Sequence, residues 1–315
     1  MKKPLIILTG PTAVGKTKLS ISLAKAVNGA IISADSMQVY RHMDIGSAKI
    51  RPEEMCGVPH YLIDVLDPSE EFHVVKFVEL AHEAMEKIYA AGQIPIVTGG
   101  TGFYIQALLK EVDFTESHGE LPIRKQLEEK AATEEGAAEL YRELSEVDPA
   151  SAETIHPNNV KRVIRALEYY HETGQKISEH NEEQKQKESP YCSAYFVLND
   201  ERSILYDRID RRVDQMICDG LVDEVFRLKE MGYTRDLVSM QGLGYKELFP
   251  YLAGECTLEE AVYIIKRDTR HFAKRQLTWF RREKDVIWLN KPDFDYDEEK
   301  ILSYMPVSYT HLRAH

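Results

Sequence analysis

The spacing of apolar positions over the first hundred residues predicts strands that alternate with helices. Residues 74–91 place apolar side chains on one helical stripe, with Gly92 as the expected C-cap, and "FYIQALL" is a further short helix. This alternation is typical of an α/β fold with a parallel sheet. Four apolar runs have the length of buried strands: "PLIILT", "AIISAD", "HYLIDVL" and "IPIVTGG", at residues 4–9, 30–35, 60–66 and 94–100.

The pattern changes after residue 114, where polar, Glu- and Lys-rich helical sequence continues to about residue 190 without a strand-like segment. Strand character returns at "SAYFVLN", and the helical sequence that follows is weakened at Gly220. A helix over roughly 258–284 then precedes a last strand, "DVIWLN". The predicted organisation is a core interrupted by a helical insertion domain: core 1–114, insertion 115–190, second part of the core 191–292 and C-terminal tail 293–315.

The last ten residues, "PVSYTHLRAH", show neither helical nor strand periodicity, and we expect them to form a loose tail without a functional role. No run in the chain approaches the ~20 apolar residues of a membrane span. The apolar run near the N-terminus leads into a glycine-rich loop and not into a cleavage site, so it predicts a strand and no secretion signal. The four cysteines form no C-x-x-C pair, which disfavours a zinc site or a disulfide framework. These features predict a soluble, cytoplasmic protein.

Charge is distributed unevenly along the chain. The net charge of −12 argues weakly against nucleic-acid binding, yet residues 266–284 hold eight Lys or Arg against two acids. Phe272, Trp279 and Phe280 lie within this segment, and basic residues interleaved with aromatic ones suit an RNA backbone and unstacked bases. The same spacing also fits an amphipathic helix with aromatic residues in the core and cations in water. The pattern leaves both interpretations open.

The segment "GPTAVGKT", from Gly10 to Thr17, is a complete G-x-x-x-x-G-K-[ST] motif between a predicted strand and a predicted helix. Gly10 and Gly15 allow the backbone N–H groups to point at an anion, and Lys16 adds a mobile positive charge. The helix N-terminus contributes its dipole, and the Thr17 hydroxyl is a candidate Mg²⁺ ligand. The motif therefore predicts a polyphosphate site but does not specify a reaction.

An acid near this loop is a candidate base or metal ligand. The run "IPIVT" ends in glycines with no Walker-B acid, whereas "AIISAD" ends in Asp35. Open α/β sheets bind ligands at the carboxyl ends of their strands, which is where Asp35 is expected. The alternative is that Asp35 only caps the following turn.

Two other segments supply candidate site residues. "TGGTGFY" (98–104) is a strand-to-helix turn in which Thr101 is available for a hydrogen bond to a substrate. Glycines in such a turn often only allow the backbone to bend and have no role in binding. Arg208 and Arg212 are four residues apart, so they lie on one helical face and are able to clamp an anion. The alternative for the arginines is surface pairing with the neighbouring acids at 207, 210 and 214.

Taken together, seven ordered segments resemble one family, the bacterial tRNA dimethylallyltransferases, also called tRNA isopentenyltransferases. The resemblance covers about residues 4 to 290, and seven blocks in the same order are far more specific than any one of them. The blocks are "GPTAVGKT", "ADSMQVYRHMDIGSAK", "TGGTGFYI", "HPNNVKRVIRALE", "LYDRIDRRVD", "MQGLGYKE" and "KRQLTWFR".

The resemblance implies a P-loop NTPase-like parallel sheet flanked by helices, and a loop that holds the diphosphate of dimethylallyl diphosphate without hydrolysis of a nucleotide. It implies transfer of the five-carbon allylic group to the exocyclic amine of the adenosine 3′-adjacent to the anticodon of tRNA. An aromatic amine is a poor nucleophile and the leaving diphosphate gathers charge, so the chemistry itself requires a base and fixed cations. The expected partners are the tRNA anticodon stem-loop and dimethylallyl diphosphate, the expected cofactor is Mg²⁺, and the expected state is a monomer.

The resemblance also implies roles for individual residues. Asp35 would be the general base, and Thr101 would hold the adenosine or a base near it. Lys16, Thr17 and either Arg212 or Arg208 would neutralise the departing diphosphate together with Mg²⁺ held at Thr17. The diphosphate would lie in the loop of Gly10, Pro11, Thr12, Ala13, Val14, Gly15, Lys16 and Thr17. The tRNA contacts implied are Asp35, Ser36, Met37, Gln38, Thr101, Arg124, Asn159, Val160, Lys161, Arg162, Val163, Met240, Gln241, Gly242, Leu243, Gly244 and Tyr245.

Departures from the family pattern are small. Val14 stands where a small polar residue is common and Ser47 where Thr is usual, and no Cys/His pattern matches the zinc finger that some eukaryotic relatives carry. Three alternatives remain at this level: a P-loop kinase acting with ATP, an isopentenyltransferase acting on free adenine nucleotides, and an RNA-binding module without catalysis. The long basic C-terminal half disfavours the first two, because neither activity requires such a surface.

Overall fold

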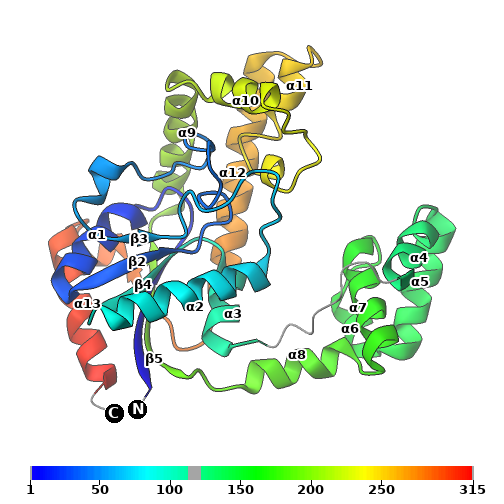
Figure 1. The fold of residues 1–315 in the computed structure, drawn as a ribbon, viewed down its shortest axis with the longest axis horizontal. Coiled ribbons are helices and arrows are strands. Elements are labelled where there is room, and N and C mark those ends of the chain that lie inside the picture. The colour runs from blue at the N-terminus through cyan, green and yellow to red at the C-terminus, as the bar shows by residue number, and fades with distance from the viewer. Residues whose placement is uncertain (1, 113–121, 314–315) are drawn as a thin grey trace. The chain divides into compact units, whose positions relative to one another are not determined.

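In the computed structural model, which describes residues 2–112 and 122–313, parallel strands form one sheet in the order β3-β2-β4-β1-β5-β6 (Figure 1). The parallel pairing and the alternation of strands with helices confirm the predicted α/β fold. The strands are β1 Lys3–Thr9, β2 Gly29–Ser33, β3 His60–Tyr61, β4 Ile94–Gly99, β5 Tyr191–Asn199 and β6 Ile287–Asn290.

Both faces of the sheet are buried, as the continuous apolar strands require. Along β1, Leu5 and Ile7 pack into one hydrophobic cluster, whereas Ile6 and Leu8 pack into a second. Helices α2 (Val74–Ala90) and α3 (Gly102–Lys110) contribute to the first cluster, and α1 (Lys16–Val27) and α13 (Glu298–Arg313) to the second (Figure 1). The carboxyl ends of β1 and β2 therefore project loops from a rigid, two-sided core.

The helices after β5 complete this core. Gly220 has φ of +99° and separates two helices, α9 and α10, at the position where the sequence predicted a weakened helix. The predicted basic helix is α12, which ends four residues before the expected boundary. The remaining elements of this part are α9 Arg202–Cys218, α10 Leu221–Glu230, α11 Leu248–Leu252, α12 Leu258–Phe280 and the 3₁₀ turns Pro52–Met55, Ser239–Gln241 and Lys291–Phe294.

The chain divides into two compact units, one comprising Met1–Leu109 with Pro190–His315 and the other Lys110–Ser189. The described part of the second unit is helical and surrounds its own apolar cluster, which includes Leu140, Leu144 and Leu167. Asp148 caps the short α6 and also accepts hydrogen bonds from Ser178. The helices of this unit are α4 Pro122–Lys130, α5 Glu134–Val147, α6 Pro149–Thr154, α7 Val160–Thr173 and α8 Ile177–Gln186.

Two sequence expectations are wrong. The strand expected over 60–66 ends at Tyr61, because Leu62 and Asp64 adopt φ of +63° and +56°, outside the extended region. The tail beyond residue 305 continues α13 to Arg313, whereas we expected no regular structure. Ile301 and Met305, one helical turn apart, are buried in the second cluster and anchor this helix. Both residues precede the last ten, so the pattern of those ten alone did not reveal the helix.

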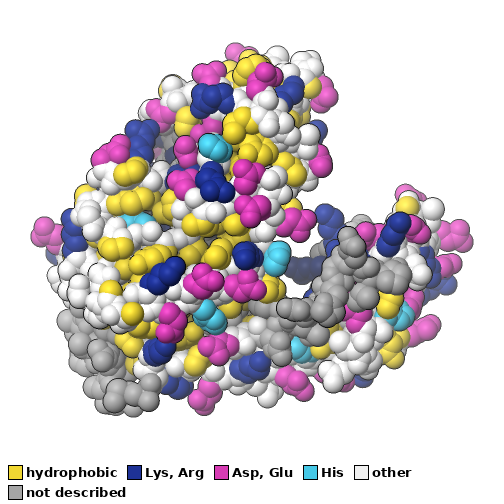
Figure 2. All heavy atoms as spheres, in the orientation of Figure 1, with side chains coloured by type: hydrophobic (Ala, Val, Ile, Leu, Met, Phe, Trp, Pro, Cys, Tyr) yellow, Lys and Arg dark blue, Asp and Glu magenta, His cyan; other side chains and the backbone are white. Residues whose placement is uncertain are grey.

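Within the described residues, no helix is long and apolar enough to cross a bilayer. Figure 2 shows acidic and basic side chains interspersed over the face drawn, so the separation of charge along the sequence is not repeated as a single-sign surface on that face.

Candidate active site

The loop between β1 and α1 has the backbone geometry of an anion-binding P-loop. Gly10 and Gly15 have φ of +148° and +102°, and Lys16 begins the helix directly after the loop. A Cβ on Gly10 would collide with the carbonyl of Leu198 on β5, so only glycine fits there. The loop and the helix N-terminus therefore provide the arrangement of backbone N–H groups and dipole that holds phosphates.

Lys16 turns back over this loop. Its Nζ donates hydrogen bonds to the carbonyls of Gly10 (2.9 Å) and Pro11 (2.8 Å). Burial and, to a smaller extent, the charge of the nearby Arg212 lower the pKa of Lys16 to about 7, although Asp35 acts in the opposite direction. The protonation of Lys16 therefore changes near neutral pH, and an anion in the loop would favour the protonated form.

The lowered pKa of Lys16 predicts that diphosphate binding depends on pH. Only protonated Lys16 attracts the anion, and a bound anion raises its pKa, so free protein at pH 8 must take up a proton in order to bind. Affinity for Mg²⁺-diphosphate should fall by up to roughly tenfold per pH unit above about 7. Titration calorimetry in two buffers of different ionisation enthalpy measures the proton uptake directly.

The matched variant for this measurement is Lys16→Arg, because a guanidinium stays protonated throughout the range. Protonation of the diphosphate itself contributes equally to the measurements on both proteins. The difference in proton uptake between wild type and Lys16→Arg therefore measures the protonation of Lys16. Identical proton uptake by the two proteins would contradict the assignment.

Two cavities adjoin this loop. The first cavity has a volume of about 780 Å³, and its wall includes Lys16, Thr17 and Arg208. The second cavity has a volume of about 420 Å³, and its wall includes Thr101 and the segment Gln241–Gly244. Asp35, Arg212, Phe272 and Gln276 line both cavities. The two spaces therefore meet at a carboxylate and a guanidinium.

Asp35 caps a turn and also lines the two cavities. Its Oδ1 accepts hydrogen bonds from the backbone N–H groups of Met37 (2.8 Å) and Gln38 (3.3 Å), as the capping alternative predicted. Across residues 2–112 and 122–313, Oδ2 has no hydrogen-bond donor. The turn fixes the carboxylate in one orientation and leaves one oxygen available to accept a proton.

The structure separates the two candidate arginines of α9. Arg208 forms an ion pair of 2.5 Å with Asp200, whose side chain is fully buried. Arg212 has no ion pair within the described residues, and burial lowers its pKa while Asp35 opposes that shift. A half-buried guanidinium without a carboxylate partner at the junction of two cavities is suited to bind an anion.

The acids around these arginines pair with other cations. Asp207 binds Arg211 on the same helix, while Asp210 and Asp214 bind Arg270 and Lys266 of α12. The surface pairing considered as an alternative for Arg208 and Arg212 is therefore absent from the described structure. These contacts also show that part of the basic charge of α12 joins two helices and is not free.

Gln276 of α12 is a site residue that the sequence did not single out. It is buried, its Oε1 accepts from the N–H of Thr12 (2.9 Å), and its Nε2 donates to the carbonyl of Gly100 (3.0 Å). The P-loop and the 98–104 turn are thereby held together by one side chain. Gln276 lies within the block "KRQLTWFR", which was the only sequence signal for a site residue here. Its contact with Thr12 was not predictable from sequence, because the two residues are 264 positions apart.

Lys291 is a second residue missed by sequence reasoning. It is buried, and a Cβ on Gly15 would lie 3.0 Å from its Nζ. Burial lowers the pKa of Lys291, and the charge of Arg208 lowers it further. A cation of the C-terminal segment therefore lies beside the P-loop, where it strengthens the local positive field.

The aromatic and basic side chains of α12 lie in different environments. Phe280 is buried in the first cluster, whereas Phe272 lines both cavities. An open hollow of about 400 Å³ is lined by Lys274, Arg275 and Trp279 of α12 and by Arg282 just after the helix, and Arg275 also lines the second cavity. The burial of Phe280 agrees with the amphipathic-helix alternative, whereas contact of this helix with RNA stays a prediction.

The residues implied as tRNA contacts fall into three groups. Ser36, Met37, Thr101 and Gln241–Gly244 line the second cavity, and Gln38 lines the first. Met240 and Tyr245 are fully buried, so they support this wall from behind.

The third group lies in the Lys110–Ser189 unit. Arg124 pairs with Glu128 and Glu168, and Val163 is buried in the core of the unit. Asn159, Lys161 and Arg162 are exposed on or before the first turn of α7, and Val160 is half-buried there.

The fold and this site together define a P-loop α/β protein with an anion-binding cavity that adjoins a second cavity. Two family models match the chain, one described as IPP transferase over residues 38–283 and one as isopentenyl transferase over residues 3–71. The chain belongs to the IPP transferase family.

Individual relatives agree with this assignment. The chain is 67% identical over 295 residues to the tRNA dimethylallyltransferase of Lachnoclostridium phytofermentans, with 94% of each chain covered. It is 51% identical to the tRNA dimethylallyltransferase of Acetivibrio thermocellus, over 94% of this chain and 95% of that one. The resemblance predicted from the seven segments is confirmed.

Solved structures show the same fold. The crystal structure of the tRNA isopentenylpyrophosphate transferase from Bacillus halodurans is 45% identical, with a TM-score of 0.74 and all of both chains covered. A eukaryotic dimethylallyltransferase acting on tRNA is 35% identical, with a TM-score of 0.79, and the match covers 91% of this chain and 74% of that one.

Proposed function

We propose that this protein transfers the dimethylallyl group from dimethylallyl diphosphate to the exocyclic amine of the adenosine 3′-adjacent to the anticodon of tRNA, with release of diphosphate. The observation that carries the proposal is the meeting of two cavities at Asp35 and Arg212, one beside the P-loop and one beside the segments implied to contact tRNA. A transfer reaction requires such a junction, because donor and acceptor must meet at the reacting atoms.

The donor occupies the first cavity. The backbone N–H groups of the P-loop and the Lys16 ammonium bind the diphosphate, and Arg212 approaches it from α9. As the bond between the allylic carbon and the diphosphate oxygen breaks, its electron pair stays on the diphosphate. Fixed cations stabilise this growing negative charge more than they stabilise the bound substrate, which is the condition for catalysis.

The acceptor adenosine enters the second cavity after it leaves the anticodon stack, at a cost of a few kcal/mol. Its exocyclic nitrogen forms the new bond to the allylic carbon and becomes positively charged. Asp35 accepts the proton that this nitrogen loses, which restores a neutral amine. Thr101 lies on the wall of the same cavity and is placed to orient the base.

Mg²⁺ fits the residues of the first cavity. Thr17, at the start of α1, is exposed and lines this cavity, and Asp35 lines the same space. Within the described part of the chain no group of three or more His, Cys, Asp or Glu forms a metal cage. Mg²⁺ characteristically binds through one or two protein oxygens with substrate phosphates and water, and when bound it neutralises charge on the diphosphate.

The remaining tRNA contacts come from exposed basic residues. Lys274 and Arg275 of α12 and Arg282 just after it are exposed, and Arg124, Lys161 and Arg162 belong to the helical unit. Phosphate contacts of this kind position a nucleic acid and make its binding dependent on salt. The protein acts as a monomer in the cytoplasm, and tRNAs with an adenosine run from the third anticodon position onward are its substrates.

The test is transfer of label from radiolabelled dimethylallyl diphosphate to unmodified tRNA with Mg²⁺ and without ATP. Labelled tRNA is the expected result, and omission of Mg²⁺ should suppress it. Free AMP and ATP are tested in parallel as acceptors. Consumption of ATP without labelled tRNA would instead support a kinase, and label on free nucleotides alone would move the acceptor from tRNA to a small molecule.

A further inference from the structure

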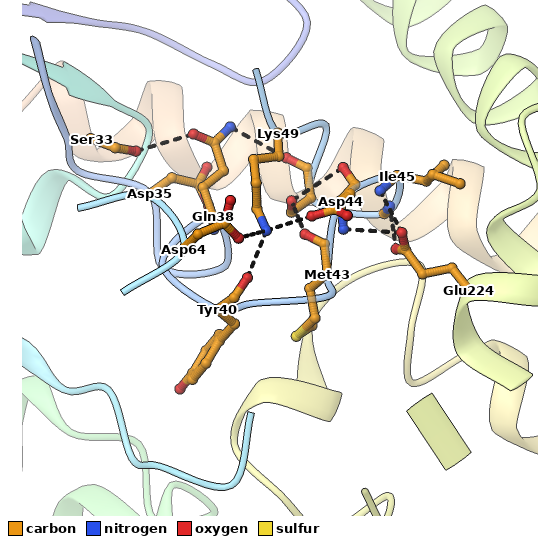
Figure 3. Close-up of polar contacts among 12 residues, drawn as sticks. Ser33, Asp35, Gln38, Tyr40, Met43, Asp44, Ile45, Lys49, Asp64 and Glu224 are labelled. Carbon is orange, nitrogen blue, oxygen red and sulfur yellow. Dashed lines mark hydrogen bonds and ion pairs between the residues drawn. The ribbon is translucent and has the colours of Figure 1, made fainter. Parts of the chain in front are cut away.

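Glu224 of α10 is a carboxylate that the proposed chemistry does not use. Its side chain is buried, with 2% of the residue exposed. Its Oε2 accepts from the backbone N–H groups of Asp44 (3.0 Å) and Ile45 (2.8 Å), and its Oε1 accepts from the N–H of Gly46 (3.1 Å). Figure 3 shows this carboxylate at the end of the 43–46 loop.

Tyr245 supplies a fourth hydrogen bond. Its hydroxyl donates to Glu224 Oε1 at 2.7 Å, and its ring is fully buried. Burial raises the pKa of Tyr245, and the Glu224 charge raises it further, so the hydroxyl remains a donor at any physiological pH. Four donors on one carboxylate offset the cost of burying its charge.

The four donors come from different cavity walls. Asp44 and Ile45 line the first cavity, whereas Gly46 lines the second. Tyr245 follows directly after Gln241–Gly244, which also line the second cavity. Glu224 therefore joins two walls that are about 200 residues apart in the sequence.

The packing around this carboxylate leaves little freedom. A Cβ on Gly46 would lie 2.5 Å from the Tyr245 ring, and a Cβ on Gly242 would lie 2.5 Å from Met37 Sδ. The 36–46 and 241–245 segments therefore approach each other closely at two glycines, Gly46 and Gly242. Polar and steric contacts fix the same separation, which is the sign of a pre-organised site.

The 38–49 loop is held independently on its other side. The buried Lys49 ammonium binds the Tyr40 carbonyl, Asp44 and Asp64 (Figure 3). Gln38 contacts Ser33 of β2 (Figure 3). The loop stays attached to the sheet without Glu224, so a change at Glu224 acts on its distance from the 240–245 segment.

We propose that Glu224 and Tyr245 form a clasp that sets the width of the second cavity and positions its walls for the tRNA base. The clasp acts through the walls and does not touch the reacting atoms, so both are positioning residues. The inference rests on the proposed function, since it assigns the second cavity to the acceptor.

The test is steady-state kinetics with each substrate varied, on wild type, Tyr245→Phe and Tyr195→Phe. Tyr245→Phe removes only the hydroxyl that joins the walls, so the KM for tRNA should rise roughly tenfold, the loss of one hydrogen bond to a charged group. The KM for dimethylallyl diphosphate should stay unchanged, because Gly46 and Tyr245 are not on the wall of the first cavity.

Tyr195→Phe is the matched control. Tyr195 belongs to the same hydrophobic cluster, and its buried hydroxyl has no hydrogen-bond partner within the described structure. Its removal should leave both KM values and kcat unchanged. A loss of folded enzyme alone would lower the apparent kcat of a variant without changing either KM.

Glu224→Gln provides the second arm. An amide presents a single oxygen, so at least one of the four donors loses its acceptor, and the KM for tRNA should rise at least as far as in Tyr245→Phe. If both residues act through their shared bond, the double variant should raise the KM for tRNA by less than the product of the two single effects.

An unchanged KM for tRNA in Tyr245→Phe, or equal rises of both KM values, would overturn the clasp. Absence of transfer by the wild-type protein would instead overturn the proposed function, so the two failures are distinguishable.

Discussion

Replacement of Asp35 by Asn is expected to lower kcat by roughly 10²- to 10⁴-fold, the range typical of a lost general base. Asn keeps an oxygen that accepts from the N–H groups of Met37 and Gln38, so the turn survives. It cannot take a proton from the amine. The KM for tRNA should therefore change little, and the measurement is single-turnover transfer of label to tRNA at saturating dimethylallyl diphosphate.

The control for this prediction is Asp219→Asn. Asp219 also lines the first cavity, is exposed, and has a hydrogen bond from Gln215, so the substitution removes a charge from the cavity without removing the proposed base. Its kcat should stay within about twofold of wild type, as expected for an exposed surface change. Full activity in Asp35→Asn would contradict the assigned base and favour a binding module without catalysis.

Replacement of Arg212 by Gln should lower kcat/KM for dimethylallyl diphosphate by roughly 10²- to 10³-fold, comparable to the loss of one group that stabilises transition-state charge. Arg212 has no ion pair within the described structure, so the change exposes no partner charge. The melting temperature should therefore change little, whereas the activity should fall. Competition by inorganic diphosphate would weaken in parallel.

Arg208→Gln is the matched variant one helical turn away, and we expect it to reduce stability more than activity. Its guanidinium already pairs with the buried Asp200, so the substitution leaves a buried charge without its partner and should lower the melting temperature. The activity of the folded fraction should fall less than in Arg212→Gln. The reverse ranking, with Arg208 dominating catalysis and Arg212 dominating stability, would contradict the assignment.

Some of the candidate site could be predicted because its signals are local. The P-loop depends on glycines at positive φ immediately before a helix, and these are written in eight consecutive residues. Asp35 follows a buried strand directly, so the sheet carries it to the same edge as the loop. Strands and helices were predictable for the same reason, except where positive φ at Leu62 ended a strand or Ile301 and Met305 extended a helix.

The sequence by itself therefore determined that this chain is a P-loop α/β protein with a polyphosphate site and an acid beside it. Only the tertiary structure decided which arginine is free, because Asp200 is nearer to Arg208 in space than the acids at 207, 210 and 214 that are nearer in sequence. It also revealed Gln276 and Glu224, whose partners lie 264 and about 180 residues away. Periodicity reports which face of an element is buried, whereas the partners of a buried polar group depend on how distant segments pack together.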